Sequence, residues 1–82
     1  MSKARRVRVA NVYVPAKRRT MLDPSKVAEL AKSMLDQGQN TPIMVREDGQ
    51  RFVLIEGVHR LEACKALGEE TILAFLVQGR RH

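Results

Sequence analysis

The sequence predicts an α+β domain with the element order β-α-β-β-α-β. Three observations lead to this prediction: Asp23-Pro24 opens a segment with helical spacing, Asp48-Gly49 separates two runs rich in β-branched residues, and Gly57 precedes a second helical segment. The connections are short and contain no linker or repeat. We therefore expect one domain over residues 1–82, with flexible basic ends at 1–6 and 79–82.

The chain is predicted to begin with a strand that Pro15 ends. Residues 7–14 carry β-branched side chains in partial alternation, which is typical of a strand. The next segment, 16–21, reads Ala-Lys-Arg-Arg-Thr-Met, and we expect a basic surface loop there.

The first helix has clear boundaries. Asp23 suits the N-cap, Pro24 suits the first helical position, and Gly38 suits a left-handed end. Lys26 lies in the first turn, where the helix dipole disfavours a cation. A bound anion would resolve this conflict, and a lysine pointing into water is the alternative. The residues expected on the apolar face are Val27, Leu30, Ala31, Met34 and Leu35.

The second half of the chain predicts a hairpin, a helix and a final strand. Strands at 42–47 and 50–55 flank a two-residue turn at Asp48-Gly49. A helix follows Gly57 and closes at Gly68, and residues 71–77 form an apolar strand buried on both faces or nearly so. The inward residues of this helix are either Leu61, Cys64 and Leu67 or Ala63 and Leu67.

Composition narrows the class of function. The net charge of +6 favours an anionic partner, a nucleotide or a nucleic acid, but three aromatic residues are too few for a base-stacking platform. A single cysteine, Cys64, excludes an internal disulfide and a multi-cysteine metal cluster, and no other residues have metal-ligand spacing. The sequence shows neither a signal peptide nor a membrane span, so we expect a cytoplasmic protein without a membrane partner.

The junction at Gly57 is the candidate anion site. A strand–glycine–helix step leaves the first helical N–H groups unpaired, and the helix dipole adds partial positive charge there. His59 and Arg60 add side-chain donors, and the planar fork of Arg60 suits a phosphate. The alternative is an ordinary strand-to-helix connection that carries two solvated basic residues.

A series of short segments follows one order along the chain: Val14-Pro15, Arg18-Arg19, Leu22–Val27, Pro42–Val45, Leu54–Arg60, 70–72 and 76–78. In this order and spacing they resemble the ParB/sulfiredoxin superfamily over roughly residues 7–78. The resemblance implies a ParB/sulfiredoxin-like fold in which the glycine turn and the helix start bind the phosphates of a nucleotide, ATP or ADP. A Mg²⁺ ion held mainly by the nucleotide, with Glu29 or Glu56 nearby, stays open.

The resemblance also implies roles for individual side chains. Lys26, His59 and Arg60 would position and neutralise a terminal phosphate that is hydrolysed or transferred, which is most of what phosphoryl transfer requires. The domain would then be a nucleotide phosphohydrolase or phosphotransferase. The implied nucleotide-binding residues are Lys26, Ser33, Gly57, Val58, His59 and Arg60.

One position departs from both branches of the family. Sulfiredoxins have Gly-Cys-His-Arg here, with a nucleophilic cysteine, and partition proteins have a glutamate at that place. This chain has Val58, which can neither attack nor accept a proton. Cys64, almost two helical turns further on, is expected to face the sheet as an inert thiol. Sulfinic-acid reduction is therefore disfavoured.

Two other functions stay open. One is a non-specific DNA-binding or nuclease-like module that contacts phosphates, in which case binding is steeply salt-dependent. The other is a non-catalytic nucleotide sensor. The choice among ATP, ADP and CTP and the oligomeric state are not determined by the sequence. The candidate DNA-binding residues are Arg18, Arg19, Arg80 and Arg81.

Overall fold

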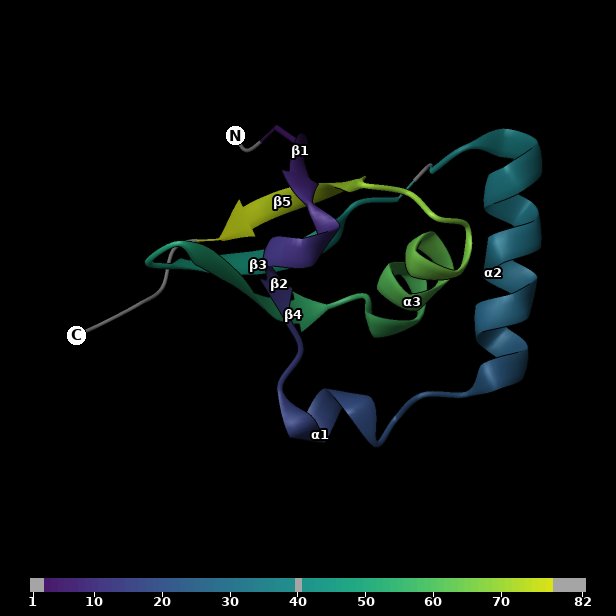
Figure 1. Cartoon of the computed structure of the whole chain (residues 1–82), viewed down its shortest axis with the longest axis horizontal. Helices are drawn as coiled ribbons and strands as arrows, with labels where there is room; N and C mark the ends of the chain where they lie inside the picture. Colours follow the sequence, from purple (N-terminus) through teal and green to yellow (C-terminus); the bar gives the residue numbers. More distant parts are fainter. Residues whose placement is uncertain (1–2, 40, 78–82) are drawn as a thin grey trace.

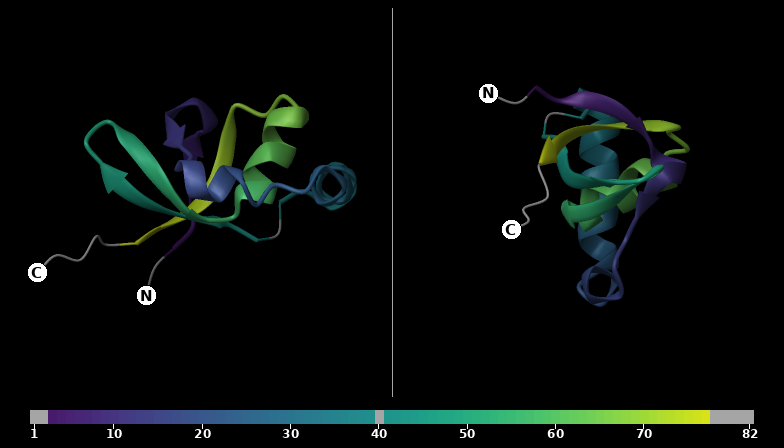
Figure 2. Two further views of the ribbon diagram at one scale, coloured as in Figure 1. Left: turned by 90° about the horizontal axis from the view of Figure 1, so that it is seen from below. Right: turned by 90° about the vertical axis from the view of Figure 1, so that its left-hand side faces the viewer.

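A computed structural model describes residues 3–39 and 41–77, which form a mixed five-stranded sheet with the two longer helices on one side (Figure 1). Helix α3 (Val58–Ala66) lies against the sheet, and α2 (Pro24–Gln37) packs mainly on α3, so that α2 appears end-on beyond α3 in Figure 2. This architecture confirms the predicted fold class. The sheet has the order β1-β5-β3-β4-β2, with strands β1 (Arg5–Arg8), β2 (Val12–Tyr13), β3 (Ile43–Asp48), β4 (Arg51–Glu56) and β5 (Thr71–Val77).

The predicted first strand, 7–14, is interrupted. A 3-10 turn, η1 (Val9–Asn11), separates β1 from β2, because β1 pairs with β5 at one edge of the sheet and β2 pairs with β4 at the other. The valines remain buried throughout, so the alternation indicated burial and not a continuous strand. The expected flexible end 1–6 is wrong for Arg5 and Arg6, which belong to β1, and residues 79–82 lie outside the described ranges.

The predicted basic loop at 16–21 contains a single helical turn, α1 (Ala16–Arg19). The amides of Arg18 and Arg19 donate to the carbonyl of Pro15, at 2.9 and 3.3 Å. The hydroxyl of Thr20 closes the turn on the carbonyl of Lys17 at 2.8 Å. Alanine, lysine and arginine all favour helix, but a single turn is too short to show helical periodicity in the sequence.

Helix α2 begins and ends as predicted. The Asp23 carboxylate accepts from the hydroxyl and the backbone amide of Ser25 at 2.9 and 3.0 Å, and these bonds hold the pKa of Asp23 below its usual value. Gly38 follows the helix at φ 76°. The predicted apolar face is half-buried, except that Leu35 is 75% exposed. Including Leu35 was wrong because α2 packs on another helix and not on the broad face of a sheet.

The hairpin and the last strand differ in detail from the prediction. Asp48 pairs with Arg51, so the two-residue turn is Gly49-Gln50, one residue later than expected, with Gly49 at φ 63°. In β5, Ile72 and Ala74 are fully buried while the alternate residues are only half-buried. The expectation of burial on both faces was wrong for the second face, because α3 covers one side of the strand only.

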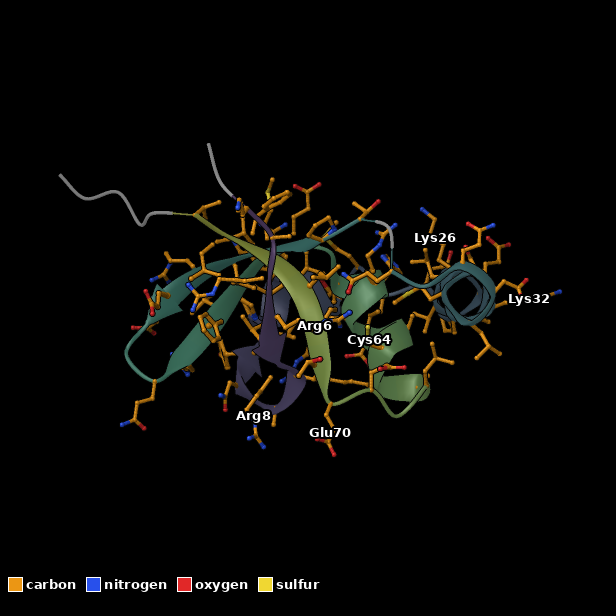
Figure 3. All side chains as sticks on the ribbon, turned by 90° about the horizontal axis from the view of Figure 1, so that it is seen from above. Arg6, Arg8, Lys26, Lys32, Cys64 and Glu70 are labelled. Carbon is orange, nitrogen blue, oxygen red and sulfur yellow. The ribbon has the colours of Figure 1, made fainter. Side chains whose placement is uncertain are left out.

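Cys64 lies where α3 meets the sheet (Figure 3), as the sequence predicts. It is 2% exposed, and burial raises the pKa of its thiol, with a further increase from the nearby carboxylate of Glu69. A buried thiol of raised pKa is a poor nucleophile. Leu61 and Ala63 are buried beside it, so parts of both predicted inward sets contact the core, and Leu67 is half-buried.

One side chain extends the sheet. The Gln39 amide accepts from the Leu73 amide at 2.7 Å and donates to the Leu73 carbonyl at 3.0 Å. The same nitrogen donates to the carbonyl of Thr41 at 3.0 Å. Gln39 thus pairs with β5 just before β3 begins to do so, and it fastens the far end of α2 to the sheet.

None of the helices in the described ranges could span a membrane.

Candidate functional site

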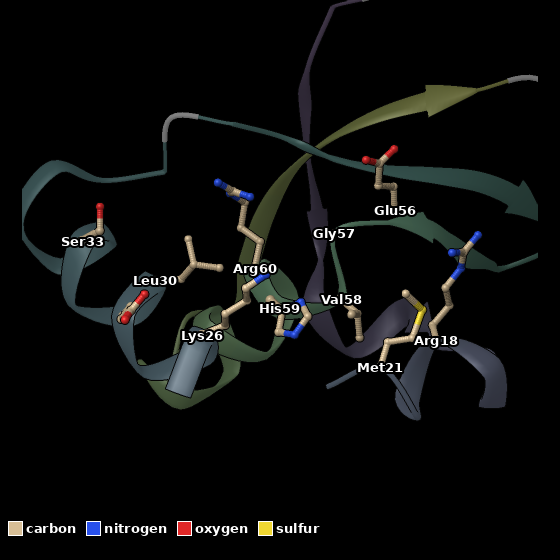
Figure 4. A pocket seen from close by; sticks show the side chains of 11 residues that line it. Arg18, Met21, Lys26, Leu30, Ser33, Glu56, Gly57, Val58, His59 and Arg60 are labelled. Atoms are coloured by element: carbon tan, nitrogen blue, oxygen red, sulfur yellow. The ribbon is translucent and has the colours of Figure 1, made fainter. Parts of the chain in front are cut away.

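A cavity of about 640 Å³ lies between α2, the start of α3 and α1. Figure 4 shows that its side chains come from α2 on one side, from the β4–α3 turn in the middle and from the α1 region on the other. Every residue implied to bind nucleotide lines it, although these residues come from two separate stretches of the chain. The lining consists of Arg18, Met21, Lys26, Glu29, Leu30, Ser33, Glu56, Gly57, Val58, His59 and Arg60.

Gly57 sets the position of the helix start. Its φ of 111° is one that residues with a side chain rarely adopt. A Cβ atom there would lie 2.7 Å from Cγ2 and 3.0 Å from Cβ of Ile43 on β3. The turn therefore passes directly against the sheet, and only glycine fits both the backbone conformation and the available space.

The N-terminus of α3 has no cap from a side chain. The first intrahelical bond is donated by Leu61 to the carbonyl of Gly57, at 2.9 Å. The amides of the three preceding residues, 58–60, consequently have no partner within the helix, and no acidic residue occupies the first turn. In α2, by contrast, Asp23 fills this role. The free amides and the helix dipole make the start of α3 attractive to an anion.

His59 connects the two helices that border the cavity. Its Nε2 atom accepts a hydrogen bond from the backbone amide of Asp23 at 3.0 Å. This bond requires an unprotonated Nε2, so the ring hydrogen of the neutral imidazole is on Nδ1. The predicted site residue thus also has a structural role, which the sequence could not show because the two residues are 36 positions apart.

Val58 contributes differently from the cysteine found in sulfiredoxins. Its side chain is 6% exposed and belongs to the hydrophobic core. The Val58 side chain therefore offers the cavity no nucleophile and no proton acceptor. Only its backbone amide can donate a hydrogen bond to a ligand.

The cavity is lined by more positive than negative side chains. The cations Arg18, Lys26 and Arg60 face two carboxylates, Glu29 and Glu56, and none of the five takes part in an ion pair within residues 3–39 and 41–77. The excess of positive charge suits a polyanion. In the same part of the chain, no group of three or more His, Cys, Asp or Glu side chains could hold a metal ion.

The residues predicted for DNA binding are divided. Arg18 lines the cavity with Lys26 and Arg60, whereas Arg19 does not line it. Arg80 and Arg81 lie outside the described residues.

The sequence reasoning missed the apolar part of the cavity wall. Met21 is 61% exposed at the cavity, and its place within a basic segment gave no signal of this position.

Comparison with known proteins identifies related chains. The model of the ParB N-terminal domain family matches residues 2–82. A probable chromosome-partitioning protein ParB of Campylobacter jejuni is 42% identical over 62 residues, which are 76% of this chain and 22% of that protein. A nucleoid occlusion protein of Halalkalibacterium halodurans is 36% identical over 68 residues, 83% and 23% of the two chains. The chain spans about a fifth of the length of these relatives.

Solved structures share the fold. Sulfiredoxin from Arabidopsis thaliana superposes with a TM-score of 0.84 at 30% identity, covering 94% of this chain and 86% of that one. ParB from Caulobacter crescentus complexed with CTP-γ-S gives a TM-score of 0.82 at 18% identity, covering 95% and 46%. A free serine kinase in complex with AMP gives 0.79 at 13% identity, covering 93% and 31%. These findings confirm the resemblance seen in the sequence, and the chain belongs to the ParB N-terminal domain family.

Proposed function

We propose that this domain binds a nucleotide in the cavity, with the phosphates at the start of α3, and that it hydrolyses or transfers the terminal phosphate. The observation that carries the proposal is the convergence of Lys26 and Ser33 from α2 with residues 57–60 on one cavity, beside three amides without helical partners. Its volume of about 640 Å³ suits a nucleotide, because small-molecule sites typically enclose roughly 300–1,000 Å³.

Each group would act on the phosphates in its own way. The backbone amides of α3 would hold phosphate oxygens, and the guanidinium of Arg60 would bind two of them at once. Lys26, a compact cation on the opposite wall, would neutralise charge that develops as the terminal phosphate leaves. The Nδ1 hydrogen of His59 would donate to a phosphate oxygen, since its Nε2 is occupied by the Asp23 amide. Ser33 would contact the nucleotide further along α2.

The acidic residues fit a nucleotide-bound metal ion better than an independent one. Glu29 and Glu56 are the two carboxylates of the cavity, fewer than a protein-held site requires. Mg²⁺, when bound, would neutralise phosphate charge and be held mainly by the nucleotide. The two glutamates would then orient water molecules around the ion.

The nucleotide is proposed to be ATP or ADP, with CTP as the competing candidate. One structural neighbour was solved with a CTP analogue, and others were solved with AMP and ADP. Calorimetric titration with ATP, ADP and CTP, each with and without Mg²⁺, should give saturable binding of one nucleotide per chain. Release of inorganic phosphate in the same mixtures tests turnover. Failure of all three nucleotides to bind would contradict the site, whereas binding without phosphate release would exclude hydrolysis and leave a sensor or a transferase that needs its acceptor.

DNA binding is a second candidate, favoured by the unpaired basic charge. Within the described ranges the ion pairs are Arg51–Asp48 and Lys65–Glu62, and the other lysines and arginines have none. Such binding would be made to phosphates, so its logarithmic affinity should fall linearly with the logarithm of salt and be equal for unrelated sequences. Fluorescence anisotropy with two unrelated duplexes measures both properties. A marked preference for one duplex would contradict non-specific binding.

A further inference from the structure

A second groove, of about 550 Å³, lies on the other side of α1 from the nucleotide cavity. The two share Arg18 and Met21 as a common wall, and the remaining residues of the second groove belong to it alone. Its lining consists of Pro15, Lys17, Arg18, Met21, Arg46, Val53, Leu54 and Ile55.

The rim of this groove is entirely cationic. Lys17 and Arg18 come from α1 and Arg46 comes from β3, and the lining contains no carboxylate. In the part of the chain that the structure describes, none of the three side chains forms an ion pair. Three adjacent cations without counter-charges favour an anionic ligand.

The floor of the groove is apolar. Arg46 and Val53 are directly paired between β3 and β4, and the neighbouring pair, Val45 and Leu54, belongs to the core on the α3 side. Arg46 and Val53 therefore face away from α3, as does Ile55, two residues further along β4. Ile55 is half-buried and Val53 is 8% exposed, so the sheet offers a small aliphatic surface, formed mainly by Ile55, beside the cationic rim.

The chemistry of the lining distinguishes between anionic ligands. No aromatic side chain is present, so the groove has nothing on which a nucleobase could stack. A phosphodiester backbone would match the rim and leave the aliphatic floor unused. A peptide that carries both carboxylates and an aliphatic side chain matches both parts. We propose that this groove binds a short acidic segment of a partner protein, with its aliphatic side chain on Val53 and Ile55 and its carboxylates at Lys17, Arg18 and Arg46.

Arg18 is shared with the nucleotide cavity, but Lys17 and Arg46 line this groove alone, so variants of these two residues test it separately from nucleotide binding. The test uses a fluorescein-labelled octapeptide of alternating glutamate and leucine, whose binding to the full chain is followed by fluorescence anisotropy. The double variant Lys17→Gln/Arg46→Gln should bind it about tenfold more weakly, a loss of about 1.4 kcal/mol for the two charged contacts together.

A matched control variant is Arg5→Gln/Lys32→Gln, which removes the same charges from exposed positions outside both grooves. Lys32 points away from α2 into solvent (Figure 3). This control should bind the peptide as the native chain does. Octapeptides of glutamine with leucine, or of glutamate with serine, should both bind much more weakly than the probe. If the double variant does not fold, Lys17→Gln alone, at an exposed position, gives the same comparison at smaller amplitude.

Several results would overturn the proposal. The native chain could fail to bind the probe, or the control variant could lose as much affinity for it as the double variant does. Either comparison peptide could also bind as tightly as the probe. A single-stranded oligonucleotide that displaces the probe, and whose own binding is lost in the Lys17→Gln/Arg46→Gln variant, would make the groove a nucleic-acid site instead. Nucleotide titration of the same variants should be unchanged, which separates failure here from failure of the nucleotide site.

Discussion

Replacing Gly57 with alanine should lower the free energy of unfolding by about 3 kcal/mol. The left-handed conformation alone typically costs about 1–2 kcal/mol for a residue with a side chain. The added methyl would also lie 2.7 Å from Cγ2 of Ile43, a residue 1% exposed, and such overpacking typically costs about 1–3 kcal/mol. Small domains are stable by only about 5–15 kcal/mol, so a large part of the stability would be lost.

Denaturant unfolding of Gly57→Ala, with Gly68→Ala as the control, measures this effect. Gly68 has a φ of 76° at the other end of the same helix, and a Cβ atom there would meet nothing within 4 Å. The control should therefore show the conformational cost of about 1–2 kcal/mol without the steric one. Equal losses of stability in the two variants would show that the contact with Ile43 relaxes freely.

Arg60→Ala should weaken nucleotide binding by about tenfold or more while leaving the fold intact. Arg60 lines the cavity, has no ion pair within the described residues and would bind phosphate through charge-assisted hydrogen bonds, each typically contributing roughly 1.5–3 kcal/mol. Calorimetric titration measures the affinity, and thermal unfolding of the free protein checks the fold.

Arg19→Ala is the matched control for this experiment. Arg19 is an exposed arginine in α1, close to the cavity along the chain, but it does not line the cavity. Its removal changes the net charge by the same amount and should leave the dissociation constant nearly unchanged. An unaltered affinity in Arg60→Ala would refute the assignment of the phosphate site, and equal losses in both variants would indicate general charge attraction.

The features that the sequence predicted correctly depend on local chemistry. The start of α2 is determined by Asp23 and Pro24, the end by Gly38, and the start of α3 by Gly57, each within a few residues. The break at Val9–Asn11 was not predictable in this way. It exists because β1 and β2 lie at opposite edges of the sheet, and the order of strands is a property of the whole fold.

The same division applies to the candidate site. The spacing of residues 57–60 indicated an anion site by itself, whereas Lys26 and Ser33 entered the prediction of a shared nucleotide site through the family resemblance. The contact between His59 and Asp23 and the exposure of Met21 at the cavity depend on how α2 and the α1 segment lie against α3. Such contacts between distant segments leave no periodic signal in one sequence.

The hydrogen bonds of His59 and Gln39 together hold both ends of α2. At the start of the helix, the Asp23 amide donates to Nε2 of His59 on α3, so that the lone pair of this nitrogen is occupied and the imidazole can meet a phosphate only as a donor through Nδ1. At the other end, Gln39 is joined to the backbone of β5 by two hydrogen bonds. The wall of the cavity that carries Lys26 is thus fixed in place before any ligand arrives, and binding need not order it.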